Sequence, residues 1–126
     1  MTLSESREDY LENLLILETR SGGFVRQEDM ASRMGFSKAS ISKAMSSLSA
    51  EGYVEFRPRG LVRLSNGGRK IAERVYDRHC FFFKVLTNLG IPTEIAQRDA
   101  CRMEHAMSEE SYQALKKELS SKMDVQ

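Results

Sequence analysis

The segment QEDMASRMGFSKASISKAMSSL, residues 27–48, decides the fold of this chain. Its apolar residues recur at helical spacing on both sides of Gly35, so we predict a short helix over 27–34 and a longer one from Ser37. The inward positions of the two helices are Met30, Ala31, Met34, Ile41, Ala44, Met45 and Leu48. A short helix, a tight turn with glycine and a longer helix form the helix-turn-helix pattern.

The outward positions of the second predicted helix are small or hydroxylated, with two lysines among them. Such side chains fit within a major groove and can hydrogen-bond to phosphates and base edges. We therefore predict DNA contacts from Ser37, Lys38, Ala39, Ser40, Ser42 and Lys43. The alternative is an ordinary surface helix, and the segment that follows argues against it.

Two short runs of alternating residues, Tyr53–Phe56 and Leu61–Leu64, come after this helix. Residues 57–60, with the sequence RPRG, separate the runs and predict a hairpin turn. A helix-turn-helix followed by a basic hairpin is a winged helix, here with a two-stranded wing. We expect Arg57 and Arg59 at its tip to contact phosphates or an adjacent minor groove.

The positive charge of the chain is concentrated in this region. The formal net charge is +1, but residues 33–70 contain eight basic and two acidic residues, a local balance of +6 that leaves −5 for the rest. A basic segment within an otherwise acidic protein indicates nucleic-acid binding. We therefore expect double-stranded DNA as a partner.

The compartment can also be inferred from composition. The sequence contains no apolar run of the ~20 residues that a membrane span requires, and no basic-then-apolar signal sequence at its start. Two cysteines, Cys80 and Cys101, are too few for a disulfide framework, although the sequence leaves a bridge between them open. We expect a cytoplasmic protein with free thiols and no membrane partner.

Further helices are predicted on both sides of the winged helix. They cover residues 4–19, 67–89, 93–106 and 109–122. Their predicted N-caps are Ser6, which pairs with Asp9, then Thr93 and Ser108. The predicted fold is therefore mainly α, with a winged-helix DNA-binding domain at 1–64 and an all-helical domain for metal binding and dimerisation at 65–126.

The long helix over 67–89 is apolar on more than one face, and such helices are usually buried on more than one side. We expect it to pack on the DNA-binding domain and on a second copy of the chain. A homodimer would also place two recognition helices one turn of DNA apart, as a palindromic operator requires.

The stretch DACRMEH, residues 99–105, carries the chemistry of the helical half. On a helix, Cys101, Glu104 and His105 share one face because they are spaced i, i+3 and i+4. A thiol, a carboxylate and an imidazole suit iron, cobalt or zinc better than magnesium or calcium. The alternative is a buried thiol beside a solvated Glu-His pair, and the triplet alone does not close a metal site.

Taken together, five motifs resemble the diphtheria-toxin-repressor family of iron-dependent and manganese-dependent transcriptional regulators. They are Glu8–Glu12, Phe36–Ser42, Gly60–Ser65, Arg78-His79 and Asp99–His105. The resemblance implies a metal site between the first, the long and the following helix. Its implied ligands are Asp9, Glu12, His79, Cys101, Glu104 and His105. It implies Mn²⁺ or Fe²⁺ as the cofactor, with Zn²⁺ or Co²⁺ possible in vitro.

The resemblance also makes this site a hybrid of two types. Asp9 is the residue of manganese-type members and Cys101 that of iron-type members, so the choice of metal stays open. The positions that feed an ancillary site in iron-type members are Phe83 and Gln97 here, and neither suits as a ligand. We expect no SH3-like domain, as in manganese-type members.

The function implied is repression of manganese or iron uptake genes, with the metal as co-repressor. One alternative is a metal-independent or redox-sensing winged-helix regulator whose metal site is degenerate. Another is a metalloenzyme, against which the sequence has no His-Glu-x-x-His pattern and no spare base near the cluster. We therefore expect no enzymatic activity and no small-molecule substrate.

Overall fold

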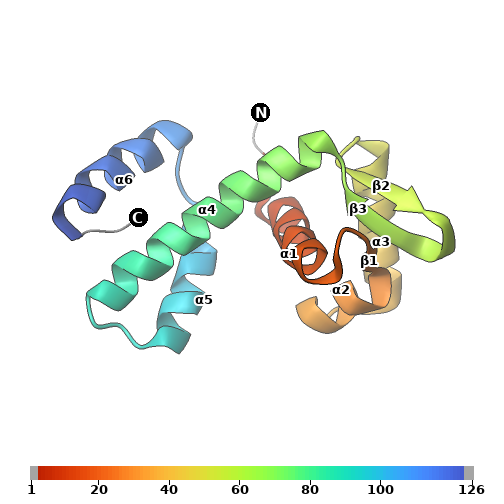
Figure 1. Cartoon of the computed structure of the whole chain (residues 1–126), viewed down its shortest axis with the longest axis horizontal. Coiled ribbons are helices and arrows are strands. Elements are labelled where there is room, and N and C mark those ends of the chain that lie inside the picture. The colour runs from red at the N-terminus through yellow and green to blue at the C-terminus, as the bar shows by residue number, and fades with distance from the viewer. Residues whose placement is uncertain (1–2, 124–126) are drawn as a thin grey trace. The chain divides into compact units, whose positions relative to one another are not determined.

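The computed structural model describes residues 3–123. Along the chain its elements are α1 (Glu5–Ser21), β1 (Val25–Arg26), α2 (Gln27–Met34), α3 (Lys38–Ala50), β2 (Val54–Arg57), the 3-10 turn η1 (Pro58–Gly60), β3 (Leu61–Leu64), α4 (Asn66–Asn88), α5 (Thr93–Met103) and α6 (Glu109–Met123) (Figure 1). The chain divides into two compact units, Met1–Glu73 and Arg74–Gln126. The prediction of a mainly α fold with a winged helix-turn-helix is confirmed. Within 3–123, no helix is both long and apolar enough to cross a bilayer.

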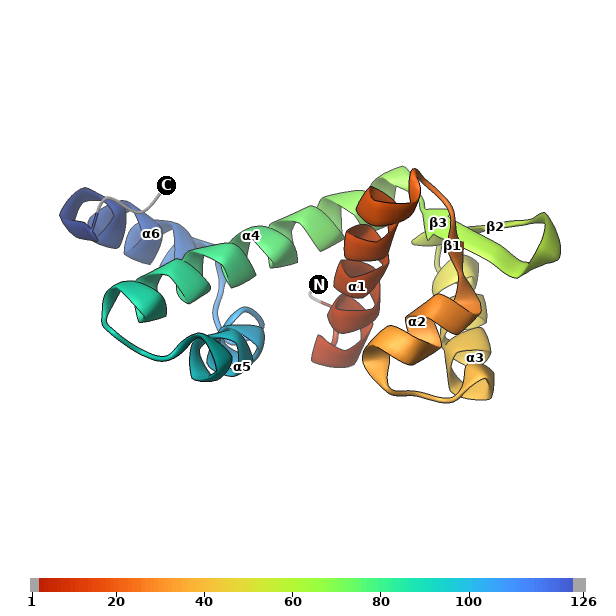
Figure 2. The same cartoon turned by 60° about the horizontal axis from the view of Figure 1, so that its bottom comes forward.

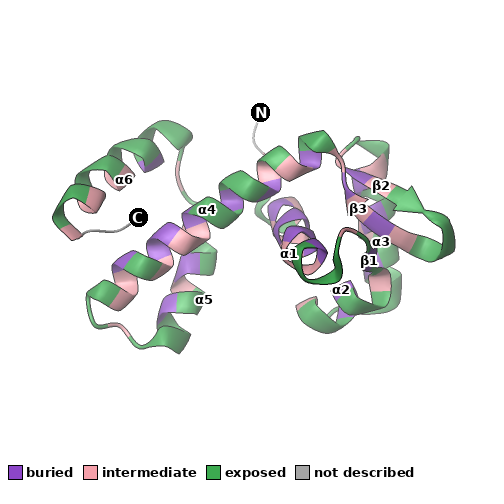
Figure 3. Ribbon diagram, viewed as in Figure 1, coloured by how far each residue is buried: buried purple, intermediate pink, exposed green. Residues whose placement is uncertain are grey.

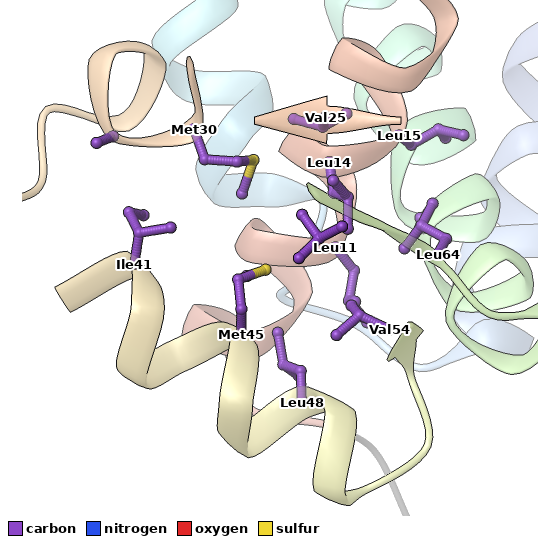
Figure 4. Packing of buried hydrophobic residues seen from close by; sticks show 13 residues of the cluster. Leu11, Leu14, Leu15, Val25, Met30, Ile41, Met45, Leu48, Val54 and Leu64 are labelled. Carbon is purple, nitrogen blue, oxygen red and sulfur yellow. The ribbon is translucent and has the colours of Figure 1, made fainter. Parts of the chain in front are cut away.

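In the first unit, α1, α2 and α3 surround one apolar core that the sheet closes (Figures 2 and 4). Leu11 and Leu14 of α1 are fully buried in the same cluster as Ile41 and Met45 of α3. Complete burial of side chains of this size stabilises a fold by about 1.5–3 kcal/mol each. The apolar positions predicted on the two helices therefore hold α1 and the helix-turn-helix together.

Gly35 makes the turn between α2 and α3. Its φ of 72° is in the left-handed region, which glycine adopts without steric cost. This conformation lets the amides of Gly35 and Phe36 donate to the Ala31 carbonyl at 2.9 and 3.1 Å. Helix α2 covers 27–34 as predicted, and Ser37 is the N-cap of α3.

The sheet has three antiparallel strands in the order β1-β3-β2. The predicted two-stranded wing is confirmed as the hairpin of β2 and β3, and β1 is a third strand that the sequence did not predict. The additional strand, β1, pairs Val25 with Val62 and Arg26 with Leu61. Two residues are too few to show alternation in sequence, and β1 is held by backbone hydrogen bonds to a distant strand. At the wing tip, Arg59 has a φ of 67°, the only non-glycine residue of 3–123 with positive φ.

Glu18 connects three elements of the first unit. Its side chain is 6% exposed, accepts a hydrogen bond from the Leu64 amide at 2.7 Å and pairs with Arg69 at 2.5 Å. Nearby, a Cβ at Gly68 would clash with the Tyr53 carbonyl oxygen. The start of α4 therefore lies directly against the chain that leads into the wing.

The second unit has its own core, in which residues of α4 pack against α5 and α6. Buried residues recur along α4 (Figure 3). Phe81 and Phe82 pack on the ring of Tyr112 with centroid distances of 5.7 and 5.8 Å. The Tyr112 hydroxyl donates to Asp77 Oδ2 at 2.7 Å, so α4 and α6 are joined by both apolar and polar contacts.

Two predicted caps are wrong and one is confirmed. Ser4, not Ser6, caps α1, and its hydroxyl accepts from the Arg7 amide at 3.3 Å. Helix α5 has Pro92 as its N-cap, without a side-chain hydrogen bond to the helix, and Thr93 is its first residue. Ser108 accepts from the Ser111 amide at 3.1 Å and caps α6 as predicted.

Candidate functional site

Glu104 is the centre of a cluster of ionisable side chains in the second unit. It is the C-cap of α5 and is 1% exposed. One carboxylate oxygen lies 3.1 Å from His79 Nδ1 of α4, and the other lies 3.2 Å from His105 Nε2. Burial of a carboxylate is costly unless it is paired, and here an imidazole lies against each oxygen.

The predicted helix over 93–106 is too long, since α5 ends at Met103. Glu104 keeps helical φ and ψ, and its amide donates to the Ala100 carbonyl at 3.0 Å. His105 follows in the turn after the helix, and its side chain is 3% exposed. Consecutive residues of a helix do not face each other, so the end of the helix at this point lets the side chains of Glu104 and His105 approach to 3.2 Å.

Cys101 adds sulfur to the cluster. Its Sγ lies 3.7 Å from His79 Nδ1, and the donor atoms of His79, Cys101 and Glu104 all lie within 4.8 Å of one another. Cys101 and Cys80 are free thiols, as expected. A thiolate, an imidazole and a carboxylate at this separation form a donor set suited to a divalent transition metal such as Fe²⁺, Co²⁺ or Zn²⁺, with the carboxylate and imidazole also suited to Mn²⁺.

The second nitrogen of His79 has a partner that fixes the ring. Nε2 lies 2.6 Å from Gln97 Oε1, so it carries a proton and donates, while Nδ1 faces Cys101 and Glu104. Hydrogen bonds to Cys101 and then Glu104 raise the pKa of His79 to about 11, although burial opposes its charged form. A metal that takes Nδ1 must therefore displace a proton.

Arg78 shapes the turn that carries Glu104 and His105. It is 6% exposed and donates to the carbonyls of Glu104 and Met107 at 3.3 and 2.7 Å. It also pairs with Glu109 at 3.0 Å. Two consecutive residues of α4 thus act on this turn. Arg78 holds its backbone in place, and His79 contacts the carboxylate of Glu104.

The two predicted ligands of α1 lie in the first unit. Glu12 is buried and Asp9 is half-buried, one helical turn apart on α1. The structure brings four of the six predicted ligands together within the second unit: His79, Cys101, Glu104 and His105. That Asp9 and Glu12 complete the same site stays a prediction.

The predicted DNA-contacting face of α3 is exposed along its length. Lys38, Ala39, Ser42 and Lys43 all lie on the exposed side of the helix. Ser37 and Ser40 are also exposed, but their hydroxyls hydrogen-bond to each other at 3.0 Å, and Ser37 accepts from the Ser40 amide at 3.1 Å. These two serines are therefore occupied in capping α3.

The two predicted wing residues have different surroundings. The Arg57 guanidinium lies 5.6 Å from the ring centroid of Phe24 and 3.9 Å from Glu55. Arg63 also covers Phe24, at 5.5 Å, and pairs with Glu55 at 2.8 Å. Arg57 thus belongs to a stacked array on the sheet, whereas Arg59 is exposed at the tip.

Sequence reasoning missed Gln97, Arg78 and Phe24 as positioning residues. Gln97, which is unsuited as a ligand of an ancillary site, contacts His79 instead, and Phe83 at the other ancillary position packs against the apolar core of the second unit. A signal for Arg78 was its position beside His79 on an otherwise apolar helix face. Phe24 gave no signal, since its role depends on a strand pairing between distant segments.

Two family models together match nearly the whole chain. The N-terminal DNA binding domain of the iron dependent repressors matches residues 2–62, and their metal binding and dimerisation domain matches residues 65–122.

Curated proteins of similar sequence are regulators of transcription. The transcriptional regulator MntR of Escherichia coli O6:H1 is 38% identical over 109 residues, which are 86% of this chain and 70% of that protein. The HTH-type transcriptional regulator MntR of Geobacillus kaustophilus is 34% identical over 104 residues, which are 82% of this chain and 72% of that protein.

Solved structures with the same fold include the T. acidophilum protein IdeR, with a TM-score of 0.79 at 26% identity. The match covers 95% of this chain and 55% of that one. A manganese-dependent transcriptional repressor in complex with manganese matches with a TM-score of 0.78 at 27% identity, over 94% of this chain and 52% of that one. This chain thus spans about half the length of these two structures.

Proposed function

The chain belongs to the iron-dependent repressor family of metal-dependent, DNA-binding transcriptional regulators, and from that premise we propose that it represses genes of manganese or iron uptake, with Mn²⁺ or Fe²⁺ as co-repressor. The observation that carries this proposal is the arrangement around Glu104, where one buried carboxylate lies against two imidazoles and close to a thiol. These polar side chains do not contribute an apolar packing surface, and their donor atoms suit a divalent cation.

The proposed ligands are the four residues of the second unit, joined by two carboxylates of α1. They are His79, Cys101, Glu104 and His105, with Asp9 and Glu12. When bound, the metal supplies a double positive charge that offsets the mutual repulsion of the acidic ligands. Gln97 holds the His79 ring in the orientation that presents Nδ1, and Arg78 holds the turn that presents Glu104.

The coupling to DNA follows from the place of α1 in the core. Leu11 and Leu14 lie on the same helix as Asp9 and Glu12 and are buried in the cluster that includes Met45 of α3. If Asp9 and Glu12 are held to the second unit, the helix-turn-helix is held with them. Metal and DNA then each raise the affinity for the other by the same factor, as linkage requires.

On this proposal, residues 1–64 bind DNA and residues 65–126 bind metal and dimerise in the cytoplasm. The dimer presents two α3 helices to a palindromic operator. The DNA contacts are Lys38, Ala39, Ser42, Lys43 and Arg59, with Ser37, Ser40 and Arg57 in supporting positions.

The choice between iron and manganese depends on two positions. The Cys101 thiolate favours Fe²⁺, since soft sulfur is a poor ligand for Mn²⁺, whereas the Asp9 carboxylate favours Mn²⁺. The relatives named MntR and the manganese-bound repressor support manganese. The chemistry of Cys101 supports iron, so both metals enter the experiment.

The test measures binding to a duplex carrying a palindromic operator of the family type, from a manganese-uptake or iron-uptake promoter. Fluorescence anisotropy gives the affinity in chelator, Mn²⁺, anaerobic Fe²⁺ or Zn²⁺. We expect a gain of about tenfold or more with Mn²⁺ or Fe²⁺, which is about 1.4 kcal/mol of coupling, and its loss in Glu104→Ala. Glu110→Ala, an exposed acid of α6, is the matched control and should keep the gain.

Equal affinity in chelator and in every metal would reject the co-repressor proposal. It would favour the second candidate, a metal-independent or redox-sensing regulator. The observation behind that candidate is the contact of the exposed Cys101 thiol with His79.

A further inference from the structure

A cleft of about 580 Å³ lies in the first unit between the wing tip, the start of α2 and the start of α3. The polar residues that line it are Arg26, Gln27, Glu28, Lys38, Ser42 and Arg59. Gln27 Nε2 donates to the Gly60 carbonyl at 2.9 Å and ties the wing tip to α2. The wing and the recognition helix therefore form two sides of one basic cleft.

The three cations of this cleft come from three elements that are distant in sequence. Arg26 is in β1, Lys38 opens α3, and Arg59 is at the wing tip. All three are exposed. A concave site with three cationic side chains and the Ser42 hydroxyl is suited to bind a phosphate group. The proposed partner, DNA, carries a phosphate at every nucleotide.

Within the described part of the chain, Glu28 is the only acidic residue that lines the cleft. Its Oε1 lies 4.0 Å from Arg26 and its Oε2 lies 4.0 Å from Lys38. One carboxylate thus bridges two of the three cations. A phosphate that enters the cleft meets a negative charge already in place between them.

We propose that Glu28 is a built-in competitor for DNA phosphate, which pairs with Arg26 and Lys38 until a phosphate displaces it. Sequence-independent binding is almost entirely a matter of phosphate contacts, so a carboxylate that occupies two cations weakens it directly. Operator binding uses phosphate contacts of this cleft and has base contacts in addition, so Glu28 opposes the phosphate contacts in both kinds of complex. The inference rests on the proposed DNA-binding function.

The test uses the full chain, with a constant low concentration of Mn²⁺, and a duplex of arbitrary sequence without a palindrome. The salt dependence of binding is measured for the wild type, Glu28→Gln and Asp29→Asn. Asp29 is the matched control, because it is the next residue of α2, is exposed, loses the same charge and does not line the cleft. Lys38→Ala reports whether the cleft contacts DNA at all.

For Glu28→Gln we expect affinity to rise about three- to tenfold and the slope of log K against log salt to steepen by about 0.9 for each cation released. Asp29→Asn should change neither the affinity nor the slope beyond a small uniform effect. If Glu28→Gln behaves like Asp29→Asn while Lys38→Ala weakens binding, the competitor role is wrong and DNA binding stands. If the wild type and Lys38→Ala bind neither this duplex nor the operator duplex, the proposed function itself fails.

Discussion

Gln97 Oε1 lies 2.6 Å from His79 Nε2, on the side of the ring opposite the Cys101 and Glu104 contacts. This contact determines which nitrogen carries the proton that remains when a metal binds. An acceptor on the far nitrogen of a metal-binding histidine fixes its tautomer and orients its lone pair. Gln97 is therefore a positioning residue of the proposed metal site, although it ligates nothing.

Gln97→Leu should weaken metal binding, because it replaces the acceptor with an apolar side chain that cannot accept a hydrogen bond. We expect the dissociation constants for Mn²⁺ and Zn²⁺ to rise about 10- to 100-fold, as is typical when such a partner is lost. Isothermal titration calorimetry gives both constants. Gln97→Glu retains an acceptor and should retain most of the affinity. An affinity in Gln97→Leu equal to that of Glu94→Gln, an exposed control on α5, would contradict the assignment.

The helix-turn-helix could be read from the sequence because its signals are local. Apolar periodicity and Gly35 predicted α2 at 27–34, and the helix predicted from Ser37 begins at Lys38 with Ser37 as its N-cap. Strand β1 could not be read, because its two residues are defined only by pairing with β3. The early end of α5 gave no signal either, since the sequence has no glycine or proline after Pro92.

The candidate site was predictable in its residue types and not in its geometry. The spacing of Cys101, Glu104 and His105 suggested one helix face, whereas the structure has His105 in a turn that Arg78 holds from α4. That interaction spans distant segments and has no local signature. The resemblance to a family supplied His79, which sequence spacing alone would have left as a structural histidine.

Asp77→Asn should lower stability near neutral pH and have less effect in acid. Partial burial would raise the pKa of Asp77, but hydrogen bonds from Tyr112 and Lys116 and the charge of Arg78 lower it overall. A carboxyl whose folded pKa is depressed contributes stability above its unfolded pKa, and that stability is lost as the pH falls through the folded pKa. The side chain is 52% exposed, so solvent screening limits the contribution to about 0.5–1 kcal/mol.

Urea unfolding of the wild type and Asp77→Asn, at about pH 7 and at about pH 3, measures this difference. We expect the gap in unfolding free energy to shrink at the lower pH. Glu118→Gln, an acid of α6 that is 66% exposed and pairs only with Lys122 in the described contacts, is the control and should show a gap near zero at both. A gap for Asp77→Asn that is the same at both pH values would assign its effect to packing.

Glu18→Ala should destabilise the first unit strongly, because it leaves the Leu64 amide without its acceptor and removes the partner of Arg69. Loss of one member of a buried, charged hydrogen-bond network costs about 2–3 kcal/mol. Glu18→Gln keeps an acceptor for the amide and should fall between the alanine variant and the wild type. Glu73→Ala, an exposed acid at the end of the same unit, should stay within about 0.5 kcal/mol of the wild type.

The urea midpoint and slope of each Glu18 variant separate stability from compactness. Equal midpoints for Glu18→Ala and Glu73→Ala would mean that water replaces the carboxylate without cost. The connection between α1, β3 and α4 would then rest on apolar packing alone.

Arg59→Gly should separate DNA binding from stability at the wing tip. Arg59 has a φ of 67°, a region that costs a residue with a Cβ about 1–2 kcal/mol and costs glycine little. We therefore expect thermal stability to stay constant or rise. If Arg59 contacts a phosphate, the affinities for operator DNA and for random-sequence DNA should fall by the same factor. The slope of log K against log salt should become shallower by about 0.9.

Arg57→Ala provides the comparison, because Arg57 stacks on Phe24 and lies near Glu55. Arg57→Ala should lower the thermal unfolding temperature. It should change the slope of log K against log salt less than Arg59→Gly does. Anisotropy titrations over a range of KCl concentrations, with thermal unfolding of the same samples, give both quantities. A larger loss of slope in Arg57→Ala than in Arg59→Gly would reverse the two roles and make the stacked arginine the phosphate contact, which would require the Phe24 array to open on binding DNA.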